Sequence, residues 1–460
     1  MTGYKKSVLK TDNKKKRVRI TKFNAYMGIG NDGLGSDAGV LNAVESLNCD
    51  CADGGLRAGP GIRVCTDRVG RMIQVPTGAA EVTKIYPVVL KTENGYKETV
   101  SIITADGALC VYDDVEGAFK EKGYVTADAI AVTAMDGELE AKTVFMGEGG
   151  AVVYDSAGAR FVGPEGVSNA GCICGNRLFM AVEPFSVAYS EALSVENFAV
   201  SIDDGGVIHF PTEFGKILSL IAVEEYVYIV YERGVSRLKS AGAAREFRLE
   251  RLAYGGGSIL AGSAANLGGV LVFLAEDGGY RVKGNKTERA WKKTLVLPLR
   301  GGQVCDHAVS EGKYLVRYID ENGWKRTAAL DAEGESGFYI FDAPALSGGM
   351  GNAYCCFDGE ICRIVKDGEL PTGSAYRFVS EKTDFGVTGR KLLKSLRFKG
   401  TGSFRVNVDD GRKETVLSLI FSDSEAVADV FLRGEAFTMT FFLDKDTKIA
   451  ELVAELEYLA

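Results

Sequence analysis

Histidine, tryptophan and proline are scarce in this chain, and their scarcity limits the chemistry open to it. The 460 residues include two His, two Trp and nine Pro. A metal centre or catalytic triad built on imidazole would therefore have to use His209 or His307. His209 stands in the apolar run GVIHFP and His307 in VCDHAV, contexts typical of a core or loop histidine. We expect no site that depends on histidine.

Long apolar runs are missing as well. The longest, around residues 217–223 and 270–275, have the length of a strand, whereas a membrane-spanning helix needs about 20 residues. No apolar core follows the basic N-terminus, so no signal peptide is predicted and no membrane partner is expected. We place the ten Cys in a reducing compartment and interpret them as small core hydrophobes, because they lack zinc-finger spacing.

The motifs of several enzyme classes are absent. The sequence contains no G-x-S-x-G elbow, no H-E-x-x-H and no Walker A loop, and YGGGS at 254–258 lacks the Gly-Lys-Ser/Thr of a phosphate cradle. The acid pairs at 113–114, 203–204 and 409–410 are interpreted as turn residues, and no calcium-binding D-x-D-x-D-G loop is present. We therefore expect no enzymatic activity, no cofactor and no catalytic, cofactor-binding or metal-binding residues.

The charge is unevenly distributed. A formal net charge of −8 disfavours a protein that coats nucleic acid through bulk positive potential. The first 22 residues are an exception, because nine of them are Lys or Arg and only Asp12 is acidic. This segment is either a solvated flexible arm or an arm that docks on an acidic partner or on nucleic acid. Its candidate assembly residues are Lys14, Lys15, Lys16, Arg17 and Arg19.

Glycine is abundant, with 57 residues, and many of these residues stand in turns between two short apolar runs. Seven such β-hairpins are predicted, because a Gly-containing turn supplies the positive φ that a tight hairpin needs. Their centres fall at residues 107, 150, 184, 234, 278, 323 and 359. The third hairpin is unusual because it turns at Pro184, which has no N–H to donate to a sheet. The spacings cluster near the roughly 40 to 50 residues of a propeller blade.

These patterns predict an all-β protein with a seven-bladed β-propeller over residues 82–367. A pair of β-sandwiches is the alternative arrangement. Before the propeller we expect a basic N-terminal arm (1–22) and a Gly-rich region with a hairpin (23–80). After it, residues 374–460 alternate well and are typical of a C-terminal, sandwich-like β domain.

Two stretches resemble virion structural proteins of tailed phages. The first is VLNAVESLNCDCADGGLRAGPGI at 40–62; the second begins with NRLF at 176–179 and continues through a YS strand to the block GGGSILAGSAANLGGVLVFLAEDGGYRV. The positions that match in the first stretch are Glu45, Asn48, Gly54, Gly55, Leu56, Arg57, Pro60 and Gly61. Those that match in the second are Asn176, Arg177, Phe179, Tyr189, Ser190, Phe198, Ile217, Leu220, Val227, Gly234, Ser258, Phe273, Leu274, Gly278, Gly279 and Tyr280.

The group resembled includes podovirus-type tail nozzle (tail tube) proteins and head-completion or stabilisation proteins. The resemblance implies a subunit that assembles as a homo-oligomeric ring below the portal or adaptor, contacts other tail proteins and lets genomic DNA pass without specific binding. It also implies a place in the virion tail or neck, after assembly in the host cytoplasm. The chain departs from the pattern at Ala58-Gly59, where an Arg is expected before Pro60.

Arg57 and Pro184 complete the candidate assembly residues, the latter as part of a stiffened loop that faces a neighbouring subunit. A propeller-based binding module, such as an adhesin or a glycan or receptor binder, is the alternative function. A propeller hydrolase or lyase ranks below it.

Overall fold

The computed structural model describes residues 16–29, 39–51, 54–137, 139–182, 184–199, 205–291, 303–320, 322–331, 338–343, 348–349 and 351–459. The chain forms two compact units. We call residues 59–375 the propeller unit, and the residues up to 58 together with 376–460 the sandwich unit. Among the described residues, no helix is both long and apolar enough to cross a membrane.

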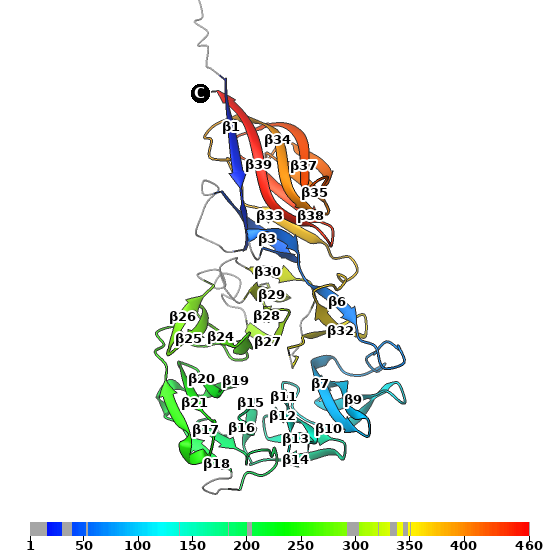
Figure 1. The fold of residues 1–460 in the computed structure, drawn as a ribbon, viewed down its shortest axis with the longest axis vertical. Coiled ribbons are helices and arrows are strands. Elements are labelled where there is room, and N and C mark those ends of the chain that lie inside the picture. The colour runs from blue at the N-terminus through cyan, green and yellow to red at the C-terminus, as the bar shows by residue number, and fades with distance from the viewer. Residues whose placement is uncertain are drawn as a thin grey trace, which may run out of the picture. The chain divides into compact units, whose positions relative to one another are not determined.

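Among the described residues, the propeller unit contains seven groups of antiparallel strands, which we number as blades I to VII in chain order (Figure 1). Blade I consists of β7 (Val82–Thr92), β8 (Gly95–Thr104), β9 (Ala108–Asp113) and β10 (Ala118–Tyr124). Blade II consists of β11 (Ile130–Met135), β12 (Ala141–Gly147), β13 (Gly150–Asp155) and β14 (Gly158–Val162). Blade III consists of β15 (Val167–Cys174), β16 (Arg177–Val182), β17 (Ser186–Tyr189) and β18 (Gly206–His209).

Blades IV to VI repeat this up-and-down order. Blade IV consists of β19 (Ile217–Val223), β20 (Tyr226–Tyr231), β21 (Gly234–Lys239) and β22 (Arg248–Arg251). Blade V consists of β23 (Ala265–Leu267), β24 (Val270–Ala275), β25 (Gly278–Lys283) and β26 (Lys286–Ala290). Blade VI consists of β27 (Gln303–Ser310), β28 (Lys313–Ile319), β29 (Lys325–Asp331) and β30 (Phe338–Phe341). Every predicted hairpin is present, and each belongs to a different blade.

Blade VII is completed by a strand from the beginning of the unit. Its sheet consists of β31 (Tyr354–Phe357), β32 (Glu360–Val365) and β6 (Gly61–Val64). The strand β6 pairs antiparallel with β32, with Ile62 opposite Ile364. The first and last parts of the propeller unit are therefore joined within one sheet.

Buried apolar clusters between neighbouring blades close the ring. Shared clusters join I to II, II to III, III to IV, IV to V, VI to VII and VII to I. At the junction of V and VI, Trp291 stacks on Tyr314 with ring centroids 5.6 Å apart, and the Tyr314 hydroxyl donates a hydrogen bond to the carbonyl oxygen of Ser263. The seven-bladed propeller predicted from the hairpin spacing is confirmed.

The sandwich unit contains two sheets. The first, which we call the outer sheet, begins with β37 (Glu425–Gly434), β34 (Lys391–Thr401) and β39 (Lys448–Leu459) in this order. Beyond β39 the sheet divides. One part of β39 pairs with β1 (Lys16–Phe23), and another part pairs with β5 (Leu56–Ala58), which in turn pairs with β4 (Cys49–Asp50). The second sheet has the order β2 (Ala25–Ile29), β3 (Val40–Leu47), β33 (Tyr376–Ser380), β38 (Thr438–Leu443), β35 (Ser403–Asp409) and β36 (Glu414–Ile420).

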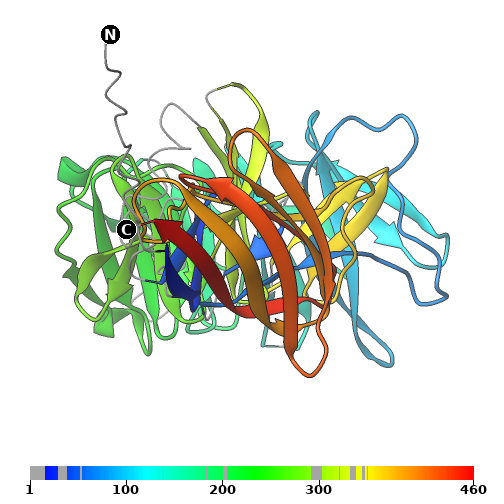
Figure 2. The ribbon, with the colours of Figure 1, turned by 90° about the horizontal axis from the view of Figure 1, so that it is seen from above.

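Aromatic side chains fill the space between these two sheets. Phe398 of β34 meets Phe404 of β35 and Phe441 of β38 at centroid distances of 5.0 and 6.2 Å, in edge-to-face geometry. All three rings are buried, and such contacts add to the stabilisation from apolar burial. The long twisted strands of this unit are orange to red in Figure 2. The C-terminal, sandwich-like β domain of the prediction is present.

The domain boundaries differ from those expected. The region 23–80 is not one module, because β3 and β5 pair with the C-terminal strands β33 and β39, whereas β6 completes blade VII. The predicted arm is also not wholly free, since residues 16–22 form most of β1, which pairs with β39. Lys14 and Lys15 lie outside the described residues. These segments pair with strands that are distant in the sequence, and no local pattern signals such pairing.

Candidate functional site

The propeller has a central channel lined by the first strand of each of blades I to VI. Two adjoining cavities occupy it, with volumes of about 400 and 380 Å³. Much of the wall is small or apolar, including Ala131, Val132, Gly171 and Ile221. Gly348 and Gly349 line it on the side of blade VII. A channel of this kind is the usual place for a ligand in a propeller of unknown function.

One part of the channel wall is polar. Lys84 of β7 and Asp306 of β27 form an ion pair with an Nζ–Oδ2 distance of 2.8 Å, and their side chains are only 11 and 8% exposed. The pair links blade I to blade VI, across the position of blade VII. The two opposite charges therefore compensate each other within the wall.

His307 lies beside this ion pair but has a structural environment. Its backbone N–H donates to Oδ1 of Asp306 at 2.8 Å, and its Nδ1 lies 2.8 Å from the carbonyl oxygen of Gly262. A carbonyl oxygen only accepts hydrogen bonds, so Nδ1 carries the proton. Burial lowers the pKa of His307, which favours the neutral imidazole. The histidine therefore fastens blade VI to the segment before blade V.

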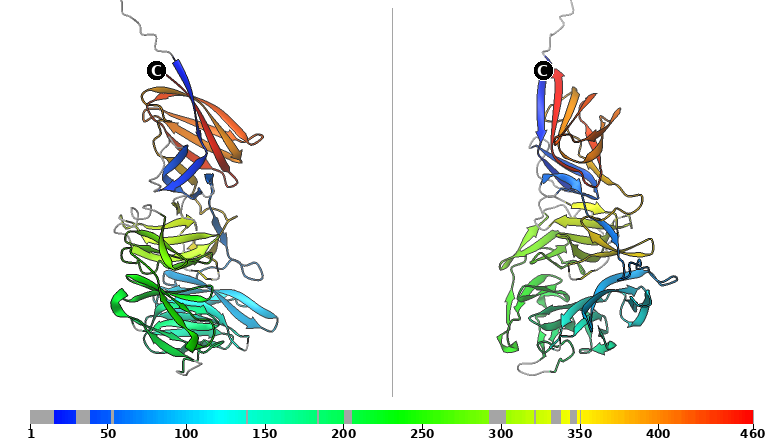
Figure 3. Two further views of the ribbon diagram at one scale, coloured as in Figure 1. Left: turned by 60° about the vertical axis from the view of Figure 1, so that its left-hand side comes forward. Right: turned by 45° about the vertical axis from the view of Figure 1, so that its right-hand side comes forward.

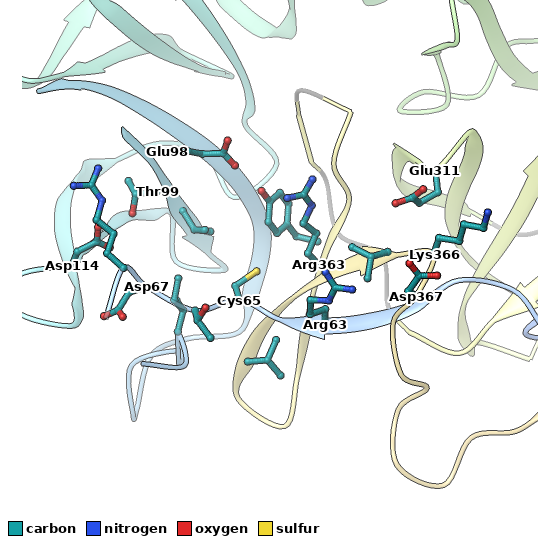
Figure 4. A pocket seen from close by; sticks show the side chains of 17 residues that line it. Arg63, Cys65, Asp67, Glu98, Thr99, Asp114, Glu311, Arg363, Lys366 and Asp367 are labelled. Carbon is teal, nitrogen blue, oxygen red and sulfur yellow. The ribbon is translucent and has the colours of Figure 1, made fainter. Parts of the chain in front are cut away.

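A second hollow, of about 650 Å³, lies between blades VII and I (Figure 4). Arg63 of β6 and Arg363 of β32 stand directly opposite each other in the ladder, an arrangement of like charges that weakens a sheet unless acids offset it. Glu98 and Asp367 lie around the same hollow (Figure 4). The hollow has mixed charge, which suits a polar contact more than the binding of a simple anion.

The reactive side chains in this hollow are held inert. Burial raises the pKa of the Cys65 thiol to about 12, so its nucleophilic thiolate form is scarce at neutral pH. Burial also acts to raise the pKa of Asp67, but hydrogen bonds from Arg71 outweigh it and hold that pKa below its ordinary value. Within the described ranges, no group of three or more His, Cys, Asp or Glu side chains could hold a metal ion.

The predicted assembly residues are distributed over both units. Lys16, Arg17 and Arg19 are exposed on β1. Arg57 instead makes an internal ion pair with the buried Asp50, at 2.9 Å, so it stabilises the β4–β5 turn. Pro184 is exposed in the connection between β16 and β17, and its carbonyl accepts a hydrogen bond from the Ile217 N–H at 2.9 Å. The proposed contact of the Pro184 loop with another subunit stays a prediction.

The residues that carry the phage resemblance have structural roles. Asn176 takes a positive φ of 60° in the turn before β16. The buried Arg177 donates from Nη1 to the carbonyl oxygen of Ser190 at 2.8 Å, and the Ser190 hydroxyl accepts from the Leu178 N–H at 2.9 Å. These hydrogen bonds hold the start of β16 against the end of β17. Gly61 is needed for another reason, since an added Cβ would lie 2.5 Å from the carbonyl carbon of Gly368.

The sequence-based reasoning missed the Lys84–Asp306 pair. The available signal was a single charge within each of two apolar strands, VTKIYPVVL and QVCDHAV. Such a charge is buried only when it is paired. The sequence did not show which residue was the partner, because the two strands are separated by more than 200 residues.

Comparisons with known proteins give structural likenesses only. No family model matches the chain, and no curated protein matches it. The virginiamycin B lyase from Staphylococcus aureus is similar with a TM-score of 0.45 and 8% identity, over 66% of this chain and 99% of that one. The β-propeller domain of Cps50 (Swd1) from Myceliophteria thermophila has a TM-score of 0.40 and 9% identity, over 63 and 99%.

BamB from Moraxella catarrhalis is similar with a TM-score of 0.37 and 11% identity, over 66% of this chain and 97% of that one. At such low identity and structural agreement, none of these likenesses carries an argument about substrate, partner or activity. The chain carries a β-propeller.

Proposed function

We propose that this chain is a non-enzymatic structural subunit of a phage tail or neck. In this proposal, copies assemble as a homo-oligomeric ring, a nozzle or tail tube, below the portal or adaptor. The ring contacts other tail proteins and forms part of the conduit through which DNA leaves the virion, without specific binding. The subunit is assembled in the host cytoplasm and ends in the virion.

The observation that carries the proposal is the structural role of the residues on which the resemblance to phage virion proteins rests. Asn176 shapes a turn, Arg177 and Ser190 join two strands through buried hydrogen bonds, and Gly61 allows a close backbone approach. Residues of this kind determine the conformation of the backbone, whereas the residues typical of an enzyme family would include reactive side chains that lie together in a cavity. A resemblance carried by such residues supports, within this proposal, a scaffold like that of those virion proteins.

The polar groups of the channel agree with this role. Lys84, Asp306 and His307 satisfy one another or the backbone, which suits rigidity more than proton transfer. The net charge of −8 also favours a conduit that does not retain DNA, because phosphate binding depends on clustered positive charge.

Oligomeric state tests the proposal. Purified full-length protein should form rings of several copies, visible by negative-stain electron microscopy and by light scattering after size-exclusion chromatography. It should also co-purify with a portal or adaptor protein when the two are produced together. A protein that stays monomeric at high concentration and joins no portal complex would contradict this function.

The alternative function is a propeller-based binding module for glycans or a receptor. The channel cavity of about 400 Å³ supports it, because it could hold a small sugar. Glycan-array binding by a monomer, abolished by substituting Asn266 on the channel wall, would favour this alternative. Turnover of a glycan by the same protein would favour the hydrolase or lyase.

A further inference from the structure

The hollow between blades VII and I lies where the propeller ring closes. Its volume is about 650 Å³, which is within the range of small-molecule sites. Its wall comes from β6, β8 and β32 and from the turn after β27, all in the propeller unit. Figure 3 shows β6, blue, beside the golden-yellow β32 with which it pairs. A ligand in this hollow would therefore touch both strands that close the ring.

Two arginines line the hollow from these two strands. Arg63 of β6 lies directly opposite Arg363 of β32, and Tyr354 of β31 lies opposite Arg363 on its other side. Side chains that are directly opposite in an antiparallel sheet share one face, with Cβ atoms about 5 Å apart. Both arginines are exposed. Their mutual repulsion weakens the pairing of β6 with β32, so an anion bound between them would stabilise it.

The two guanidinium groups have few partners of their own. Nη2 of Arg363 donates a hydrogen bond to Oδ1 of Asn352, which is a neutral group. Arg63 makes no side-chain hydrogen bond to any residue that the structure describes, and neither arginine makes an ion pair there. Most of their N–H groups are therefore available to a ligand. A planar guanidinium fork matches the geometry of a carboxylate, which it binds through two parallel hydrogen bonds.

Two exposed acids of the same wall also lack a basic partner. Glu98 of β8 accepts a hydrogen bond from the hydroxyl of Tyr354. Glu311 lies in the turn after β27, where it takes a positive φ of 52°, and both acids are exposed. Neither forms an ion pair within the described ranges. In the view of Figure 4, Arg63 and Arg363 lie between these two acids.

Other acids around the hollow are already neutralised. Oδ2 of Asp67 lies 2.6 Å from Nε of Arg71, and Oδ2 of Asp114 lies 2.8 Å from Nζ of Lys97. The unpaired charges are thus a distinct set, in which acids and bases line one cavity without joining. Apolar side chains line the same cavity, namely Val64, Ile73, Val100 and Val365. Such a wall suits a ligand that carries both charges on a small apolar frame, whereas a simple anion would be repelled by the acids.

We propose that this hollow binds a zwitterion, either a short peptide with free ends or a free amino acid. The carboxylate of the ligand lies between Arg63 and Arg363, and its ammonium group lies against Glu311. Glu311 is the better partner for the ammonium group because it has no hydrogen bond to give up, whereas Glu98 is held by Tyr354. The bound ligand joins β6 to β32 and stabilises the closed ring. This binding does not depend on the proposed ring function.

Trialanine and alanine are the probes, titrated into the full-length protein at low ionic strength and followed by isothermal titration calorimetry. Both are zwitterions at neutral pH, and the one that binds more tightly identifies the peptide or the amino acid as the ligand. N-acetyl-trialanine lacks the ammonium group, and trialanine amide lacks the carboxylate. Each of these two derivatives should bind about tenfold or more weakly than trialanine, because one charge-assisted contact is lost.

Substitutions of the charged residues assign each contact. Arg63→Gln should weaken trialanine binding by about tenfold or more and leave the binding of trialanine amide unchanged, since the amide has no carboxylate to lose. Glu311→Gln should weaken trialanine binding and leave that of N-acetyl-trialanine unchanged. Arg248→Gln is the matched control, because Arg248 is an exposed arginine of β22 outside the hollow. The control should bind every probe like the wild type.

Thermal unfolding gives a second measurement and checks that each variant is folded. Trialanine should raise the thermal midpoint of the wild type as its concentration increases, because a ligand that binds only the folded state stabilises it. Without ligand, Arg63→Gln should not lower the midpoint, since the substitution removes a repulsion between opposite residues. The rise with trialanine should be smaller in Arg63→Gln and in Glu311→Gln than in the control.

The results that overturn the proposal are definite. Absence of binding by both probes up to about 10 mM, a concentration that reveals even a millimolar dissociation constant, shows that the hollow is no zwitterion site. Equal binding of trialanine and both of its derivatives also contradicts the proposal, as does full binding by Arg63→Gln. A protein that binds trialanine as expected but forms no rings would overturn the proposed function and leave this site standing.

Discussion

The buried ion pair between Lys84 and Asp306 allows a sharp test of the propeller. Substituting Lys84 with Met removes the cation that forms an ion pair with the Asp306 carboxylate, whose side chain is only 8% exposed. Loss of one member of a buried pair costs about 3–5 kcal/mol of unfolding free energy. The double variant Lys84→Met/Asp306→Leu should lie within about 1–2 kcal/mol of the wild type, because both charges of the pair are removed together, along with the bond from the His307 N–H.

Tryptophan fluorescence suits this measurement. Both Trp residues, Trp291 and Trp324, belong to the propeller unit, and Trp291 is 2% exposed at the junction of blades V and VI. Urea unfolding followed by this signal therefore reports on the propeller and not on the sandwich unit.

The refuting result is equally definite. A Lys84→Met variant that loses less than about 1 kcal/mol would mean that Asp306 is solvated or has another cation, contrary to the burial cited above. A double variant as unstable as the single one would show that packing, and not charge, explains the loss.

Two further predictions concern the backbone and pH. Gly61→Ala should lower the unfolding free energy by about 1–3 kcal/mol, because the added Cβ would lie 2.5 Å from the carbonyl carbon of Gly368. The control Gly255→Ala, whose added Cβ would have no atom within 4 Å, should lower it by less than about 1 kcal/mol. Thermal unfolding measures both variants. Equal midpoints for the two variants would contradict the close approach. The hydrogen bond from Lys120 lowers the pKa of Asp113 to about 2. A lowered carboxyl pKa stabilises the protein above the unfolded value, so this contribution is lost as the pH falls from about 4 to about 2. Asp113→Asn should therefore lower the thermal midpoint slightly at pH 7, since the pair is partly exposed, and not at all near pH 2; a constant difference at both pH values would contradict this assignment.

The blades were predictable because their signal is local. Each hairpin needs only a few residues in a turn, and Gly107, Gly149, Gly323 and Gly359 do take positive φ. These turns recur at a blade-like spacing, so the sequence indicated seven units. Pro184 also fits, because it lies in an exposed connection and leaves no sheet hydrogen bond unmade.

The closure of the ring and the composition of the sandwich unit were not predictable in this way. They depend on pairs such as Ile62 with Ile364 and Val18 with Glu457, which are hundreds of residues apart. The sequence of a short strand does not identify the strand that it pairs with, since many strands have similar side-chain patterns. The function of Arg57 was hidden for the same reason, because its ion pair with Asp50 depends on the β4–β5 turn.

The pairing of β6 with β32 has a consequence for biosynthesis. The ribosome makes residues 61–64 before blade I, yet their place in blade VII exists only after residues 354–365 have emerged. The strand β1 must likewise wait for β39. Early strands of both units therefore remain without partners during most of translation, a period in which open strands are prone to aggregate. A chaperone that shields residues 16–64 on the nascent chain would raise the yield of folded protein.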